Sequence, residues 1–349
     1  MHKTIAVGVI GTGGMGTRHA HNLHRLVPGA AVAGTSDVDR DRAARVAAEC
    51  GGAAVFDDPY QLIEDPTVNA VLIASTDSTH AAFVRACLEA GKPVMCEKPL
   101  AETAQDAWHL VQAEQALGRR LVAVGLMRRF DPQHLAVERA VRAGKVGRGL
   151  MFKGTHRNAK VPTHLPGRVV ITNSAVHDID SARWLLGQEV TEVFVRGVRT
   201  RPHFSGETVD MLLLQLALTD GCLATVEVTS AAGYGYEVCA EVVGETGTVT
   251  TAQPADAVVR LNGQSATDVD QIWLDRFRQA YVDELVGWVE SVQTGTSFRG
   301  ASAWDGYVSQ VVTDACIEAL NTGQPVQVPT PETPALYRED AAPEVVGAD

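Results

Sequence analysis

The segment ITNSAVHDID at residues 171–180 places three polar side chains at helical spacing. Asn173 and His177 are four residues apart and share one face of a helix, and Asp180 continues the same stripe. A histidine exchanges a proton near neutral pH, so this face is suited to general-base chemistry. The pattern also fits a core helix with a buried, hydrogen-bonded histidine and with Asn173 as its N-cap.

A second group with chemical meaning is the glycine-rich turn GTGGMG, which follows the apolar run 4–10 directly. In such a turn Gly11 permits a tight bend, Gly13 lets the backbone approach a pyrophosphate, and Gly16 lets strand and helix pack closely. The helix that begins here offers free N–H groups to phosphates. The predicted cofactor cradle also includes Thr12, Gly14 and Met15.

Asp37 lies at the end of the second apolar run, where a carboxylate accepts hydrogen bonds from ribose hydroxyls. A carboxylate repels a 2′-phosphate and Val38 offers no cation, so these two cofactor contacts predict NAD rather than NADP. Arg40 and Arg42 are close in sequence, and we expect them to lie past the pocket. The alternative is an ordinary glycine turn followed by a surface aspartate.

Polar residues also end the fourth and fifth apolar runs. Ser75 and Thr76, with His80 further on, are predicted to contact the cofactor where it crosses the sheet, although residues here also cap helices. Lys98 follows Glu97 at the same edge, and an ammonium beside a nicotinamide ring has a lowered pKa. Lys98 is therefore suited to position an alcohol and stabilise an alkoxide, unless it merely covers its own strand end. Glu97 is counted among the cofactor-binding residues, as a packing or loop-tethering residue rather than a reactant.

The elements that must position these groups fall into two sets. Apolar runs alternate with helical patterns up to residue 125, which predicts a doubly wound parallel Rossmann sheet covered on both faces. Beyond residue 130, successive strand-like segments with few helices predict an α/β domain with a large, mostly antiparallel open sheet. The expected division is an NAD-binding domain at 1–126, a substrate-binding and oligomerisation domain at 127–330, and a tail at 331–349.

The bulk properties exclude several classes of function. A formal charge of −12 disfavours nucleic acids and anionic membrane surfaces as partners. No run approaches the ~20 apolar residues of a membrane span, and nothing resembles a signal peptide. The six cysteines are scattered and show no CxxC, so we expect a reduced, cytoplasmic protein without a metal.

Taken in order, GTGGMG, AGKPVMCEKPLAET, GLMRRFDP, GTHRN, HDID and WLDRFRQAY resemble the Gfo/Idh/MocA family of NAD(P)-dependent oxidoreductases. The motifs MRRFD, THRN and GYGYE are most similar to members that oxidise inositols. The resemblance covers nearly the whole chain. It implies a cis bond before Pro99 and pairing of the open sheet into dimers or tetramers.

The resemblance also implies roles for individual residues. His177 matches the catalytic general base, beside Lys98, and Asn173 stands where the inositol-oxidising members carry Asp. An amide hydrogen-bonds a hydroxyl but cannot take a proton, so the preferred polyol is left open. Further matches to substrate contacts are Arg128, His156, Asn158, Asp180 and Tyr236, whereas Asp178 is expected to face away. The alternatives are a salt-bridging Arg128, an exposed strand face for His156 and Asn158, and simple packing for Tyr236, while Trp184, Trp273 and Phe277 are interpreted as core.

The sequence therefore predicts NAD-dependent oxidation of a secondary hydroxyl of a cyclitol, myo-inositol or a related inositol, to a ketone. Six-membered polyhydroxylated rings look alike to such a pocket, so a dehydrogenase of a pyranose sugar or glycoside is the first alternative. A cofactor-binding sensor without turnover is the second, and the presence of both Lys98 and His177 disfavours it.

Overall fold

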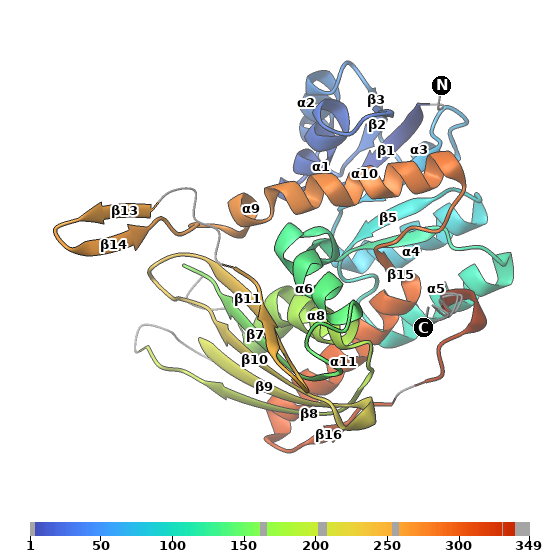
Figure 1. The fold of residues 1–349 in the computed structure, drawn as a ribbon. Coiled ribbons are helices and arrows are strands. Elements are labelled where there is room, and N and C mark those ends of the chain that lie inside the picture. Colours follow the sequence, from blue (N-terminus) through green and yellow to red (C-terminus); the bar gives the residue numbers. More distant parts are fainter. Residues whose placement is uncertain (1–3, 161–165, 202–207, 253–257, 330, 339–349) are drawn as a thin grey trace, which may run out of the picture.

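The computed structural model describes residues 4–160, 166–201, 208–252, 258–329 and 331–338, and these fold around two large sheets (Figure 1). The first sheet is covered by helices on both faces, and the second is covered on one. The predicted combination of a Rossmann sheet and an α/β domain is confirmed. The expected domain end at 330 and the tail beyond 338 lie outside the described residues.

The first sheet has the strand order β15-β6-β5-β4-β1-β2-β3, and all neighbours are parallel except β15 and β6. Its strands are β1 (Ile5–Ile10), β2 (Ala30–Ser36), β3 (Ala54–Phe56), β4 (Ala70–Ile73), β5 (Val94–Glu97), β6 (Val122–Gly125) and β15 (Ala301–Ser302). Its helices are α1 (Gly14–Arg25), α2 (Arg40–Glu49), α3 (Pro59–Glu64), α4 (Asp77–Glu89) and α5 (Ala104–Leu117). The chain runs outward from β1 to β3 and then crosses back to β4, so a ligand cleft is expected at the carboxyl ends of β1 and β4.

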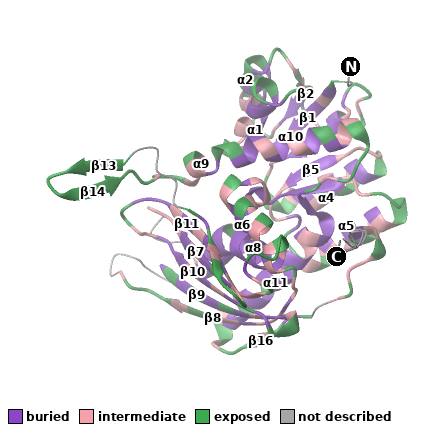
Figure 2. Ribbon diagram, in the orientation of Figure 1, coloured by how far each residue is buried: buried purple, intermediate pink, exposed green. Residues whose placement is uncertain are grey.

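The second sheet has the order β12-β11-β7-β10-β9-β8-β16 and is antiparallel except for the pair β7 and β10. Its strands are β7 (Gly149–Arg157), β8 (Val190–Val198), β9 (Met211–Leu218), β10 (Leu223–Thr229), β11 (Glu237–Gly244), β12 (Thr248–Thr250) and β16 (Val326–Gln327). In β9 the alternate residues Leu212, Leu214 and Leu216 are buried, whereas Met211 and Leu213 are exposed on the bare face (Figure 2). This period of two is the pattern of a sheet that is covered on one side.

Helices α6 (Pro132–Arg142), α8 (Val176–Leu186) and α11 (Ala303–Thr322) lie between the two sheets (Figure 1). Helix α10 (Arg278–Thr294) and β15 follow the second sheet in sequence but pack on the first, where Leu285 and Trp288 join the core of β1 and β4. The small hairpin β13 (Val258–Leu261) and β14 (Gln264–Thr267) projects away from both sheets (Figure 1). The C-terminal helices α10 and α11 therefore connect the two domains, because both come after β12 of the second sheet in sequence and pack against elements of the first domain.

Short helical turns complete the described chain. They are α7 (Gly167–Val170), a π-helical turn (Ile171–Ala175), α9 (Trp273–Arg276) and the 3-10 turns Met127–Phe130, Thr219–Gly221 and Ala335–Tyr337. The part of the tail that is described is docked, because the buried Tyr337 donates a hydrogen bond to Glu114. Within the described residues no helix is long and apolar enough to cross a membrane.

Candidate active site

The glycine turn has the geometry that a pyrophosphate cradle requires. Gly11 has a φ of +84°, and a Cβ there would lie 2.5 Å from the Ser75 backbone. A Cβ on Gly16 would lie 1.8 Å from the Gly11 carbonyl oxygen, so helix and strand need glycine to pack. A Cβ on Gly13 or Gly14 would meet nothing within 4 Å, and Gly13 caps α1 without a side-chain hydrogen bond. Free N–H groups and open space at a helix N-terminus fit a dinucleotide pyrophosphate.

A cavity of about 320 Å³ extends from this turn between the ends of β1, β2 and β4. Of the predicted cofactor residues, it is lined by Gly11, Gly13, Asp37, Val38, Ser75 and Thr76. Buried Thr12 shapes this cavity from behind, because its backbone N–H and Oγ both donate to Asp37, at 2.6 and 3.0 Å. The residues at this end fit the adenosine half of the cofactor.

Two cofactor-side expectations are wrong. Arg42 does not lie past the pocket: it lines the cavity and its Nη2 donates to Asp37 Oδ1 at 2.6 Å. Arg40 does not line the cavity and is paired with Asp57, which does. His80 does not line either the adenosine cavity or the substrate cavity, because its buried ring lies between the carbonyl oxygens of Pro99 and Ser75, at 2.6 and 3.2 Å. It links the end of β4 to the loop after β5.

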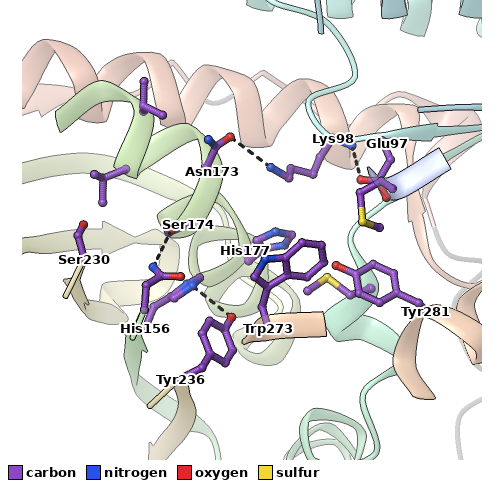
Figure 3. A pocket seen from close by; sticks show the side chains of 15 residues that line it. Glu97, Lys98, His156, Asn173, Ser174, His177, Ser230, Tyr236, Trp273 and Tyr281 are labelled. Atoms are coloured by element: carbon purple, nitrogen blue, oxygen red, sulfur yellow. Dashed lines mark hydrogen bonds between the residues drawn. The ribbon is translucent and has the colours of Figure 1, made fainter. Parts of the chain in front are cut away.

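The second cavity, of about 310 Å³, lies where the π-helical turn and α8 of the second domain face the end of β5 (Figure 3). Lys98 and His177 both line it, together with Asn173, and the Lys98 Nζ donates to Asn173 Oδ1 at 3.5 Å. The expected cis bond between Lys98 and Pro99 is present. The predicted residues that also line this cavity are Met15, Glu97, His156, Asn158 and Tyr236.

The electrostatics of this cavity favour a neutral base. Burial lowers the pKa of His177 well below its usual range, and repulsion from Lys98 and Arg128 adds to the effect. The imidazole is therefore unprotonated and able to accept a proton. Burial also lowers the pKa of Lys98, against the opposing attraction of Glu97. His177 Nδ1 has no hydrogen-bond partner among the residues that the structure describes, so none of their carboxylates holds this nitrogen.

Asn173 is not an N-cap, because the helix does not begin there. Helical backbone starts at Gly167 and continues through α7 and the π-helical turn into α8. A π-helical turn contains one residue more than an α-helical turn, and such turns occur often at functional sites. Asn173 is exposed on this turn and its side chain faces Lys98 (Figure 3). The alternative of a capping role is thereby excluded.

Arg128 does not line the cavity, contrary to expectation, and lies fully buried behind it. Its Nη1 donates to Asp178 Oδ1 at 2.6 Å, and its Nη2 lies 2.9 Å from His156 Nδ1. Asp178, which we expected to face away from the substrate, therefore helps to hold Arg128 and His156 in place behind the cavity. Burial alone would raise the pKa of Asp178, but Arg128 and His156 outweigh it and lower the value to about 2. The network holds His156, whose Nε2 lies 3.3 Å from the Tyr236 hydroxyl.

Asp180 also does not reach the cavity, although the sequence predicted a substrate contact. Both of its oxygens accept from Arg129, at 2.6 and 3.1 Å, and Arg129 Nη2 donates to Asp305 at 2.8 Å. A carboxylate in a bidentate pair with a guanidinium has little hydrogen-bonding capacity left for a substrate hydroxyl. Asp180 instead ties α8 to the start of α11.

Several residues that line the second cavity were not predicted from the sequence. Met127, Ser174, Ser230 and Tyr281 line the cavity, and so does Trp273, which was expected in the core. These residues lie in elements far apart in the sequence, and no spacing pattern marks them. Phe277 is buried as predicted.

His19 was missed for the same reason, although it follows the glycine turn. It is buried in α1, and its Nε2 lies 2.7 Å from Glu97 Oε1. Burial would raise the pKa of Glu97, but His19 and then Lys98 outweigh it, so the pKa is lowered. The second oxygen of Glu97 accepts from the Lys98 backbone N–H at 3.3 Å. Glu97 therefore tethers the lysine to the cofactor helix.

No group of three or more His, Cys, Asp or Glu side chains is arranged to hold a metal ion in the described part of the chain. The fold and the two cavities are those of a dinucleotide-dependent oxidoreductase, with one cavity at the glycine turn of the first domain and the other where the second domain faces the end of β5. The chain matches the family models for the Gfo/Idh/MocA oxidoreductases, the NAD-binding Rossmann fold over residues 5–126 and the C-terminal alpha/beta domain over residues 139–328. This chain belongs to that family and uses NAD.

The similar proteins include two named inositol 2-dehydrogenases. One, from Rubrobacter xylanophilus, is 49% identical over 99% of both chains. The other, inositol 2-dehydrogenase 2 from Saccharopolyspora erythraea, is 45% identical over 97% of this chain and 100% of its own. A solved structure of myo-inositol dehydrogenase from Lactobacillus casei, in complex with NAD(H) and myo-inositol, has a TM-score of 0.93 at 32% identity, covering 96% of this chain and 100% of that one.

Proposed function

We propose that this protein oxidises one secondary hydroxyl of a cyclitol, myo-inositol or a related inositol, to the ketone with NAD as hydride acceptor. The observation that carries the proposal is the meeting of Lys98 and His177, from different domains, in one cavity beside the glycine turn (Figure 3). The similarity to inositol dehydrogenases supports the choice of substrate class. The polar lining, with His156, Asn158 and Tyr236, suits a ring that carries many hydroxyls.

The roles of the residues follow from their charges. Neutral His177 takes the hydroxyl proton, and Lys98 donates a hydrogen bond to the same oxygen and stabilises the alkoxide that forms. NAD, which the glycine turn and Asp37 would hold, would supply the acceptor for the hydride of the carbinol carbon. The oxygen loses one proton and the carbon one hydride, which leaves a ketone.

Asn173 holds the Lys98 amine by a neutral amide. An amide neither accepts a proton nor stabilises an imidazolium by charge, so proton transfer rests on His177 with Lys98. Asn173 stands where the inositol-oxidising members that the chain resembles carry Asp, so the hydrogen-bonding group that faces the substrate ring is different. This difference supports a second candidate substrate class, the pyranose sugars and their glycosides.

One panel separates these candidates. NADH formation is measured at alkaline pH with myo-inositol, scyllo-inositol, chiro-inositol, glucose and methyl glucoside as substrates. The cyclitol proposal expects the highest kcat/KM with an inositol, and a clear preference for glucose or the glycoside would replace it by the second candidate. Tight NAD binding without reduction by any of the five compounds would indicate a sensor and contradict both.

We also propose that the bare face of the second sheet pairs with a second copy of the chain, giving a dimer or, by further pairing, a homotetramer. Met211, Leu213 and Leu223 are exposed on this face, and an apolar sheet face of this kind is typical of protein interfaces. Leu213→Glu should then reduce the mass measured by light scattering, and an unchanged mass would contradict this interface. The six cysteines are all free, which supports a reducing, cytoplasmic compartment.

A further inference from the structure

Arg42 brings a guanidinium to the ribose end of the dinucleotide cleft. It lies in the first turn of α2 and lines the adenosine cavity. Its Nη2 and Nε donate to the two oxygens of Asp37, at 2.6 and 3.3 Å. The Asp37 side chain is 4% exposed, whereas that of Arg42 is 35% exposed and can move toward solvent. The cleft therefore contains a cation next to the carboxylate that selects NAD.

The Asp37 carboxylate is saturated with donors in this arrangement. Besides Arg42, it accepts from the Thr12 backbone N–H and Oγ, and from the Asp39 backbone N–H at 2.8 Å. Two carboxylate oxygens offer about four lone-pair sites, and five donors already surround them. The Thr12 and Asp39 donors are fixed by the glycine turn and by the start of α2. A ribose hydroxyl that binds Asp37 must therefore displace Arg42.

We infer that Arg42 is a specificity-determining residue and the cation of a latent 2′-phosphate subsite, which Asp37 neutralises. A guanidinium fork matches a phosphate with two parallel hydrogen bonds. Arg40, the neighbouring arginine, does not line the cavity and is paired with Asp57, which does, and Val38 carries no charge. The preference for NAD then rests on one carboxylate. A single substitution of Asp37 should admit NADP, without an added basic residue at position 38.

The test is a double-mutant cycle with direct binding as its readout. Affinities for NAD⁺ and NADP⁺ are measured by titration calorimetry on the full chain, without a polyol, in the wild type, Asp37→Ser, and Asp37→Ser with Arg42→Gln. We expect Asp37→Ser to bind NADP⁺ roughly 10- to 100-fold more tightly than the wild type does, the range for a hydrogen bond to a charged group. Adding Arg42→Gln should remove that gain. Asp37→Ser with Arg40→Gln is the matched control and should keep it.

Two results would overturn the inference: no gain in NADP⁺ affinity in Asp37→Ser, or a gain that survives Arg42→Gln. If Asp37→Ser does not fold, Asp37→Asn removes the charge while keeping the side-chain shape, and the same comparison applies. NAD⁺ affinity and the thermal midpoint of each variant report whether the cleft is intact. Because no polyol is present, the outcome is independent of the proposed cyclitol activity.

Discussion

Replacing Asn173 by aspartate tests how the cavity sets its proton transfer. The Lys98 Nζ lies 3.5 Å from Asn173 Oδ1, so the substitution would place a carboxylate against the ammonium with little change of shape. A negative charge there stabilises the protonated forms of both Lys98 and His177, and their pKa values should rise. Oxidation needs the unprotonated base, so the rate should reach its plateau at higher pH than in the wild type.

The size of the effect follows from the distance. Two unit charges at the observed 3.5 Å attract by about 5 kcal/mol in an effective dielectric of about 20, which is an upper bound of between ~3 and ~4 pKa units. Lys98 is half-buried and Asn173 is exposed on the cavity wall, so solvent screens part of this attraction. We expect the ascending limb of log kcat/KM against pH to move up by roughly 1–2 units.

The assay is NADH formation with myo-inositol across a pH series, for the wild type and Asn173→Asp. The control is Asn262→Asp, which adds the same charge in the exposed turn of the β13–β14 hairpin and should leave the limb in place. A limb that does not move in Asn173→Asp, or that moves equally in the control, would refute the electrostatic coupling of Asn173 to Lys98 and His177.

Three further predictions concern the support of this site. Lys98→Ala and His177→Ala should each lower kcat by about 100-fold or more in the NADH assay, and near-normal turnover would remove that residue from the mechanism. His19→Ala leaves Glu97 Oε1 without its donor and should lower kcat by roughly 10-fold, with KM for the polyol little changed and with rescue by His19→Gln. Equal rates in all three proteins would leave His19 a packing residue only. Arg129→Leu removes the counter-charge of the buried Asp180, while Asp305 keeps Arg183 nearby, and should destabilise the fold by about 3–5 kcal/mol, seen as a lower thermal midpoint; an unchanged midpoint would contradict that role.

The predicted site residues that do line the two cavities or form the glycine turn are those whose position depends on the local backbone. The strand, turn and helix around Gly11, Gly13 and Gly16 form a continuous stretch, and steric demands within it dictate glycine. Asp37 follows from its position at the end of the next strand. Lys98 likewise follows from its place at a carboxyl edge of the parallel sheet.

The errors concern side chains whose partners come from distant parts of the chain. Asp180 was read as a substrate contact because it shares a helical stripe with His177, but Arg129 takes both of its oxygens. Arg128 was also predicted to contact the substrate, but it donates a hydrogen bond to Asp178 and does not line the cavity. A long side chain can reach several partners, and helical spacing says nothing about which of them lies within hydrogen-bond distance.

The amino-acid sequence alone predicted the Rossmann sheet, the α/β domain that follows it and the glycine-rich turn, because apolar periodicity and glycine sterics act over a few neighbouring residues. Only the tertiary structure decided that the helix of His177 begins before Asn173 and passes through a π-helical turn. It alone revealed the pairing of Arg42 with Asp37 and of His19 with Glu97. Those pairs depend on how separate elements pack, and charge compensation in a buried site is settled by distances in space rather than along the chain.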